Sequence, residues 1–277
     1  MVLRISTLSE NTAGMPGLLA EWGLSVLVDT GEARILMDTG TSISVTHNAP
    51  VFGIDLGTVD KIVISHGHYD HTGGLAPVLQ QIGREIDVIA HPDMWANKYT
   101  LVGEFQRYIG PPASRKELEG LGARFKLSRE PVWITEDIVT TGEVPMVTEY
   151  EEIEPSMRVK EGEELLPDPL LDDRALIIKT EAGLVVILGC AHRGAINTIR
   201  HAQAITGVES IHAVIGGTHL LRASEERILL TAAALQEMGV QRVGVSHCTG
   251  FRAAMLLAQQ LGDVFFNNNT GTVITVP

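Results

Sequence analysis

The chain has only two cysteines, Cys190 and Cys248, among its 277 residues. Two cysteines exclude a framework of structural disulfides. The sequence also has no apolar run long enough to span a bilayer, and residues 1–6 lack the pattern of a signal peptide. These absences predict a cytoplasmic protein without a membrane partner.

A basic stripe of the kind that binds nucleic acid is also missing. Lys and Arg number 21 against 34 Asp and Glu, so the formal net charge is −13. Eight glutamates fall within residues 143–164 and would repel a phosphate backbone. We therefore expect no nucleic-acid partner, whereas a small phosphorylated substrate stays possible because bound dications reverse the local potential. Oligomeric state is not indicated by the sequence.

The chain has the pattern of a single α/β domain, residues 1–277. Apolar content of 44% and charged content of 20% are ordinary for a globular protein. Apolar strands near residues 2–8, 24–30, 34–40 and 61–65 precede a helix at 75–82, and a second α/β half follows residue 175. Its best helix, 224–238, has Ser224 as N-cap and an expected apolar stripe of Leu229, Leu230, Ala233 and Leu235. Residues 92–165, rich in Pro, Gly and acids, are predicted to be an insertion that covers the site.

One run predicts a metal site. Residues 65–75 read Ser-His-Gly-His-Tyr-Asp-His-Thr-Gly-Gly-Leu and follow a short β-branched strand. Alternate residues of an extended segment point the same way, so His66 and His68 can bind one ion. A turn at Tyr69 would direct Asp70 and His71 toward a second ion. Imidazole and carboxylate suit zinc, iron or manganese; the simpler alternative is a polar surface turn.

Three more histidines, His192, His219 and His247, each follow an apolar strand near a glycine. One such histidine is usually structural, but three at equivalent places beside an incomplete ligand set favour a shared site. Two metals need about six to eight protein ligands, and the first run offers four. We expect His192 and His247 to complete the ligands, and His219 to act on the substrate as a catalytic residue.

The run resembles the signature of the metallo-β-lactamase superfamily. Four further phrases resemble the branch named for 7,8-dihydropterin-6-methyl-4-(β-D-ribofuranosyl)aminobenzene-5'-phosphate synthase: residues 172–176, 189–194, 216–220 and 246–250. The resemblance implies an αβ/βα four-layer sandwich. It also implies that His66 and His68 bind one metal and that Asp70 and His71 bind the other.

The bridging ligand departs from the family pattern. Acidic residues Asp172 and Asp173 precede the central strand pair, and Cys190 follows it, whereas the family places an acid after the pair. Either aspartate could reach a metal or remain a solvated cap. Cys190 could be a soft ligand or a small buried residue.

These features predict a hydrolase with two divalent ions, zinc before iron or manganese, that acts on a small phosphorylated or cyclic phosphate metabolite, possibly pterin-related. Asp70 and His219 are the expected catalytic residues. Arg193, Arg107 and Asn48 are the expected substrate contacts, although an arginine is more often a surface residue. The alternatives are an iron-dependent redox enzyme, a thioesterase, and a metabolite-binding protein without catalysis.

Overall fold

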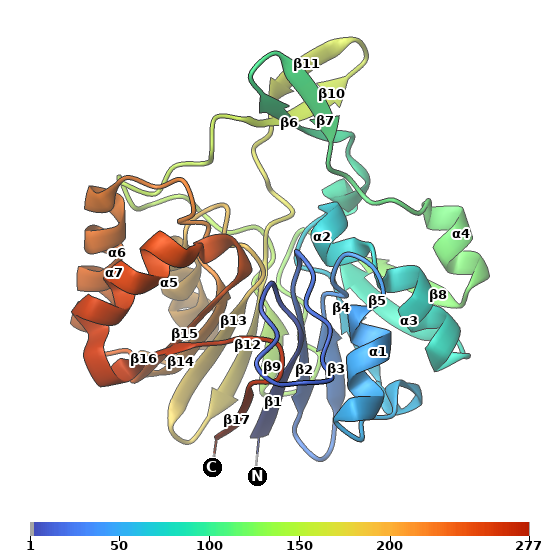
Figure 1. Cartoon of the computed structure of the whole chain (residues 1–277), viewed down its shortest axis with the longest axis horizontal. Coiled ribbons are helices and arrows are strands. Elements are labelled where there is room, and N and C mark those ends of the chain that lie inside the picture. Colours follow the sequence, from blue (N-terminus) through green and yellow to red (C-terminus); the bar gives the residue numbers. More distant parts are fainter. Residues whose placement is uncertain (1–2, 277) are drawn as a thin grey trace.

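Two β-sheets lie face to face between two layers of helices in the computed structural model, which describes residues 3–276 (Figure 1). The first sheet contains, in spatial order, β17 (Val273–Val276), β1 (Leu3–Ser9), β2 (Ser25–Asp29), β3 (Arg34–Met37), β4 (Lys61–Val63), β5 (Ile86–Ala90) and β8 (Ala123–Leu127). The second contains β16 (Phe265–Asn267), β15 (Arg242–Ser246), β14 (Ile211–Gly217), β13 (Gly183–Leu188), β12 (Ala175–Thr180) and β9 (Ile138–Thr140). This arrangement confirms the predicted αβ/βα sandwich.

Each sheet is covered on its outer face by helices. The first carries α1 (Ser44–Val51), α3 (Leu75–Ile82) and α4 (Arg115–Gly120), and the second carries α5 (Ala195–Thr206), α6 (Glu225–Glu237) and α7 (Phe251–Leu261). Strand side chains alternate between the two faces: Ile35 and Met37 pack between the sheets, whereas Leu36 packs toward the helices. Burial on both faces explains why the strands read as nearly continuous apolar runs.

The direction of the strands brings the loops of both halves to one edge. Strands β3, β4 and β5 run parallel, as do β13, β14 and β15. In an open parallel sheet, the loops after the carboxyl ends of the strands form the binding crevice. The short helix α2 (Tyr69–Thr72) begins at the turn predicted at Tyr69 and lies at this edge, at the upper end of the main-sheet strands in Figure 1.

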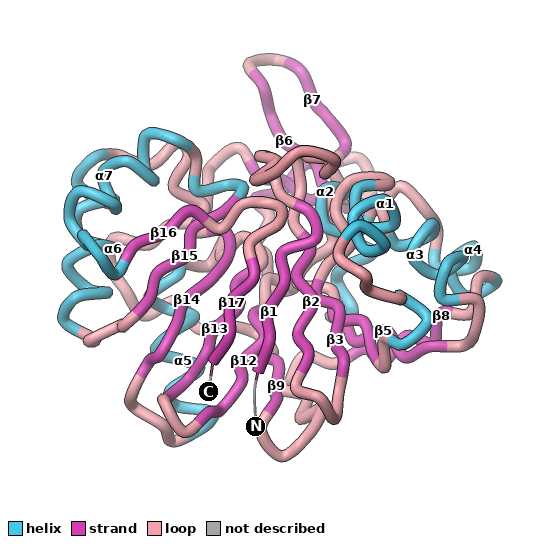
Figure 2. The backbone as a smooth tube through the Cα atoms, turned by 60° about the horizontal axis from the view of Figure 1, so that its bottom comes forward, coloured by secondary structure: helices cyan, strands magenta, loops and turns pink. Residues whose placement is uncertain are grey.

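The predicted insertion is divided. Strands β8 and β9 pair with β5 and β12 and so belong to the two main sheets. Only β6 (Lys98–Val102), β7 (Phe105–Tyr108), β10 (Met157–Glu161) and β11 (Glu164–Pro167) form a separate four-stranded sheet, here called the cap sheet. It stands above the strand ends in Figure 1 and projects from the body in Figure 2. Residues 92–165 therefore contain strands of the main sheets as well as strands of the cap sheet. The sequence did not separate the two kinds because the strand pairings are long-range.

Two helices differ from expectation. Helix α1 is an element that the sequence analysis did not predict, and Ser44, Val45, Asn48 and Ala49 are its buried residues. In α6 the predicted N-cap is confirmed, since Ser224 accepts a hydrogen bond from the Arg227 amide. The predicted apolar stripe is wrong for Leu229 and Leu230, which are exposed. The buried face of the helix consists of Ile228, Thr231, Ala232 and Leu235. Among the described residues, no helix combines the length and apolarity needed to cross a membrane.

Candidate metal centre

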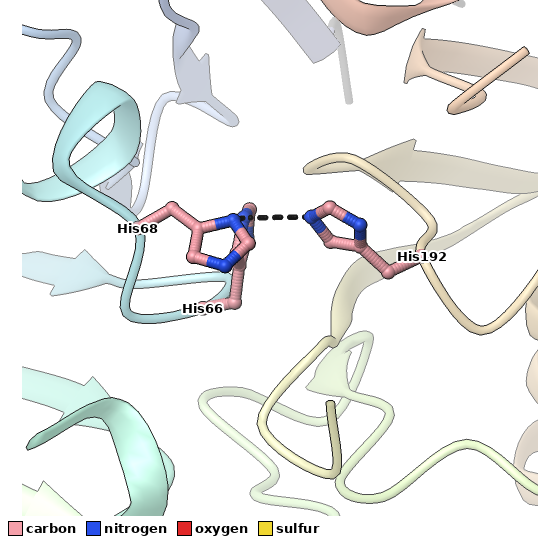
Figure 3. A group of neighbouring side chains, drawn as sticks. All are labelled: His66, His68 and His192. Carbon is pink, nitrogen blue, oxygen red and sulfur yellow. Dashed lines mark hydrogen bonds between the residues drawn. The ribbon is translucent and has the colours of Figure 1, made fainter. Parts of the chain in front are cut away.

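Side chains from both halves of the molecule converge at the strand-end edge. His66 and His68 follow β4, and His192 follows β13 of the other sheet. His66 Nε2 lies 2.9 Å from His68 Nδ1 and 3.2 Å from His192 Nε2. Figure 3 shows the three rings pointing toward one another across the two loops. We call His66, His68 and His192 the first donor set.

A second donor set consists of Asp70, His71 and His247, whose ligand atoms all lie within 4.8 Å of one another. His247 Nε2 is 3.3 Å from Asp70 Oδ2. Cys190 lies beside this set, with its Sγ 3.1 Å from His71 Nε2. The structure thus brings together all six residues expected as metal ligands.

The spacing of these donors fits bound metal ions. Ligands about 2.0–2.3 Å from one ion lie about 2.8–3.8 Å apart when the angle at the metal is about 90–110°. The separations of 2.9, 3.2, 3.3 and 3.1 Å all fall in this range. The imidazole, carboxylate and thiol groups of the two donor sets and Cys190 therefore fit divalent metal ions.

Protonation of the first donor set is also suited to coordination. Burial lowers the pKa of His66 and of His192 well below the usual value, and neighbouring histidines add to the effect. Burial likewise lowers the pKa of His68 to about 3, with a further contribution from Lys98. The three imidazoles are therefore neutral at pH 7, which is the form that binds metal.

Asp38, which follows β3, orients ligands of both sets and was not predicted from the sequence. Its Oδ2 lies 2.6 Å from His71 Nδ1 and accepts a hydrogen bond of 2.7 Å from Ser65 Oγ. Ser65 Oγ in turn lies 2.8 Å from His66 Nδ1. A carboxylate on the far ring nitrogen fixes the tautomer and turns the other nitrogen toward a metal. The signal in the sequence was an acid directly after a buried strand.

Backbone strain is concentrated at this edge. Five described non-glycine residues have φ in the left-handed region, and four of them, Asp38, Ala191, His219 and His247, carry or adjoin the donor sets. Such conformations cost about 1–3 kcal/mol each and persist where the surroundings enforce them. Gly67 has a related role, because a Cβ at this position would lie 2.1 Å from the Met94 carbonyl oxygen. Only glycine allows the loop to pass there between His66 and His68.

Asp172 and Asp173 hold the ligand loops by hydrogen bonds. Asp172 Oδ2 accepts from the Gly67 amide at 2.8 Å, and Asp173 Oδ2 accepts from the Arg193 amide at 2.9 Å. Both side chains are buried, which excludes the alternative of solvated caps. Neither occurs in a group of neighbouring metal-ligand atoms among the described residues. The two aspartates therefore position the loops that carry His66, His68 and His192.

A buried lysine links the same loops to the cap sheet. Lys98, on β6, is 1% exposed, and its Nζ lies 2.9 Å from both Asp168 Oδ2 and Asp172 Oδ1. Burial alone would lower the pKa of Lys98, but Asp172 and Asp168 raise it above the ordinary value. The charged lysine thus connects the cap through Asp172 to the Gly67 amide. Sequence reasoning missed this residue, which looks like an ordinary strand lysine.

Replacement of Lys98 by methionine is expected to lower the free energy of unfolding by about 3–5 kcal/mol, because two buried carboxylates lose their counter-charge. The matched control is Lys61→Met, whose pair with Asp87 is partly exposed, and its expected cost is about 0–1 kcal/mol. Urea denaturation of the metal-free chains measures both. Equal losses for the two variants would contradict the role assigned to Lys98.

His219 lies beside the first donor set without belonging to it. Its ring centroid is 4.1 Å from that of His192, and its Nε2 lies 3.1 Å from Glu154 Oε2. Burial lowers the pKa of His219, but contacts with Cys248 and Glu154 raise it to about 9. The hydrogen bond from His219 in turn lowers the pKa of Glu154 to about 2. The pair is thus a protonated imidazole held by a carboxylate at the cleft wall.

The cleft over the donor sets has a volume of about 340 Å³. Its lining includes aromatic Trp22 and Tyr69 and cationic Arg107 and Arg222. Arg222 is paired with Glu154 at 2.8 Å, whereas Arg107 is close to Tyr69, with a 3.3 Å hydrogen bond to the phenol oxygen. Among the described residues Arg107 forms no salt bridge, so its charge is available to an anion.

Two expected substrate contacts lie elsewhere. The amide of Asn48 bonds to the backbone of Leu8 and Leu19, so it fastens α1 to the N-terminal segment. The guanidinium of Arg193 donates to the carbonyl oxygens of Val144 and Pro169. Neither residue lines the cleft. The structure thus gives both side chains structural contacts outside the cleft, which only long-range contacts reveal.

Known proteins resemble the chain over its full length. It is 33% identical over 283 residues to 7,8-dihydropterin-6-methyl-4-(β-D-ribofuranosyl)-aminobenzene-5'-phosphate synthase of Methanocaldococcus jannaschii, covering 98% of this chain and 96% of the relative. The crystal structure of Tm1679, a metal-dependent hydrolase of the β-lactamase superfamily, matches with a TM-score of 0.85 and 30% identity over 99% of both chains. The sequence profile described as metallo-beta-lactamase superfamily matches residues 23–192. The chain therefore belongs to the metallo-β-lactamase superfamily.

Proposed function

We propose that this protein is a two-metal hydrolase of a small phosphorylated or cyclic phosphate metabolite. The observation that carries the proposal is the convergence of two donor sets on one cleft, each with spacings suited to a divalent ion. Zinc is the favoured metal, and iron and manganese accept the same ligands. Two bound dications supply Lewis acidity and a nucleophilic water at neutral pH.

The side chains around the cleft have separate tasks in this chemistry. Asp70 binds metal through a carboxylate whose pKa is held below its usual value. Burial raises this pKa, but the hydrogen bond with His247 and the charges of the nearby histidines outweigh the effect of burial. Asp38 keeps the His71 ring oriented. His219, protonated and anchored by Glu154, can donate a proton or a hydrogen bond to a substrate oxygen. Because His219 faces His192, that oxygen lies beside the first donor set.

The lining of the cleft supports a compact substrate with an anionic and an aromatic part. Arg107 on the cap sheet offers a guanidinium that forms no salt bridge among the described residues, and this is the group that matches phosphate oxygens best. Trp22 and Tyr69 offer faces for an aromatic ring. The relative from Methanocaldococcus jannaschii is named for a compound with a pterin and a phosphate, which accords with a pterin-related substrate.

The metal content and substrate class can be tested together. Elemental analysis of protein purified without chelators is expected to give about two ions per chain. The metal-loaded protein is then offered a phosphodiester, a phosphomonoester, a glutathione thioester and a cephalosporin side by side. We expect a phosphate ester to be turned over fastest, and Arg107→Ala to raise its KM more than it changes kcat.

Each alternative predicts a different result in the same assays. Faster turnover of the thioester would replace the phosphoesterase by a thioesterase, and iron with oxygen uptake would indicate a redox enzyme. A chain that holds its metals but turns over none of the substrates would support a binding protein. As a control for Arg107, Arg124→Ala alters an exposed arginine of β8 that pairs with Glu85, away from the cleft lining.

A further inference from the structure

Cys190 lies at the junction of the two donor sets. Besides its 3.1 Å contact with His71, its Sγ belongs to three groups of candidate metal-ligand atoms that lie within 4.8 Å of one another. These groups are His66 with His71, His192 with His219, and His247 with Cys248. Donor atoms from both sets thus surround one sulfur atom.

The surroundings of Cys190 differ from those of a packing cysteine. It is 3% exposed but forms part of the cleft lining, beside imidazoles. His71 Nδ1 is occupied by Asp38, so the Nε2 that faces the sulfur is the nitrogen left for a metal. The following residue, Ala191, has φ of 51°, a strained conformation in the loop between Cys190 and His192.

Cys248, the other cysteine, is committed to backbone hydrogen bonds. Its thiol donates to the Cys190 carbonyl oxygen at 3.5 Å, and its sulfur accepts from the His219 amide at 3.3 Å. A methyl group in place of the glycine hydrogen at Gly217 would lie 2.6 Å from this sulfur, so the thiol is tightly confined. Cys248 thus supports the loops, and it provides a matched control for Cys190.

We propose that Cys190 binds as a thiolate shared by the two metal positions. Its sulfur takes the place between the donor sets where the family pattern has an acid. The inference rests on the two-metal centre of the proposed function. On metal binding the thiol loses its proton to solvent, and the sulfur takes up two metal bonds. Asp70 and Cys190 then supply the two anionic ligands, while Asp172 and Asp173 remain outside the centre as positioning residues.

Cobalt titration tests the proposal without relying on activity. Cobalt(II) replaces zinc in such sites, and a thiolate ligand gives a sulfur-to-cobalt charge-transfer band in the near ultraviolet. In the unaltered chain and in Cys248→Ala, we expect the band to grow with the first and again with the second equivalent. In Cys190→Ala and Cys190→Ser we expect it to be absent.

The chain has only two cysteines, so a band retained in Cys248→Ala must come from Cys190, even where the Cys190 variants do not fold. A band that grows with one equivalent only would show a ligand of a single metal and overturn the sharing, and two bound ions without a band would overturn the proposal entirely. The ion count from the same samples separates a failure of the shared thiolate from a failure of the two-metal centre. Fewer than two ions per chain would contradict the two-metal centre itself, and the shared thiolate with it.

Discussion

Replacement of Asp70 by alanine is expected to lower kcat/KM for the phosphate ester by about a thousandfold or more, while the chain stays folded. Asp70 supplies the carboxylate of the second donor set, and among the described residues His247 is the only polar partner of its side chain. Loss of the carboxylate removes a metal ligand but leaves no buried hydrogen-bond donor of the backbone unpaired. Activity is therefore lost through the metal centre and not through unfolding.

Three measurements on one preparation check this expectation: the kinetic constants, the number of bound ions and the far-ultraviolet circular dichroism. The bound ions should fall from about two to about one, and the spectrum should not change. Asp93→Ala is the control, since Asp93 is a partly exposed acid paired with Arg129 and lies outside the cleft lining. Retained turnover in Asp70→Ala would remove Asp70 from the mechanism.

The local part of the site could be predicted because its geometry is encoded in neighbouring residues. His66 and His68 share a direction on an extended segment, and Asp70 and His71 follow a turn, so four donors are fixed within six positions. Strand ends then located His192, His219 and His247, because parallel strands present their carboxyl ends at one edge. The family resemblance supplied the layer arrangement that unites the two halves.

Long-range contacts set the limit of that prediction. The bond from Asp38 to His71 spans 33 positions, and that from Asp172 to Gly67 spans 105. No local pattern distinguishes such acids from solvated ones. The contacts of Asn48 and Arg193 could not be foreseen for the same reason, since their partners lie in segments distant in sequence. In α6, the apolar residues allowed either of two helix faces to be buried, and the face that packs against the core is the one with Ile228 and Ala232.

Replacement of Asp38 by alanine should weaken metal binding by about 10–100-fold, although Asp38 contacts no metal position directly. Its carboxylate holds the His71 ring and, through Ser65, the His66 ring, so its loss frees a ligand in each donor set. The Ser65 amide, which donates to Asp38 Oδ1 at 2.7 Å, also loses its partner in a fully buried position. The metal-free chain should therefore lose about 3–5 kcal/mol of stability as well.

Competition with a chelator measures the metal affinity of Asp38→Ala, and urea denaturation of the metal-free chain measures its stability. Asp29→Ala is the matched control: it is another aspartate at a strand end of the same sheet, but it pairs with the partly exposed Arg34. We expect Asp29→Ala to cost about 0–1 kcal/mol and to leave metal affinity unchanged. If Asp38→Ala binds both ions as tightly as the unaltered chain, the orientation of His66 and His71 does not depend on this carboxylate. In that case the ligand loops are positioned by the hydrogen bonds that Asp172 and Asp173 accept from the Gly67 and Arg193 amides.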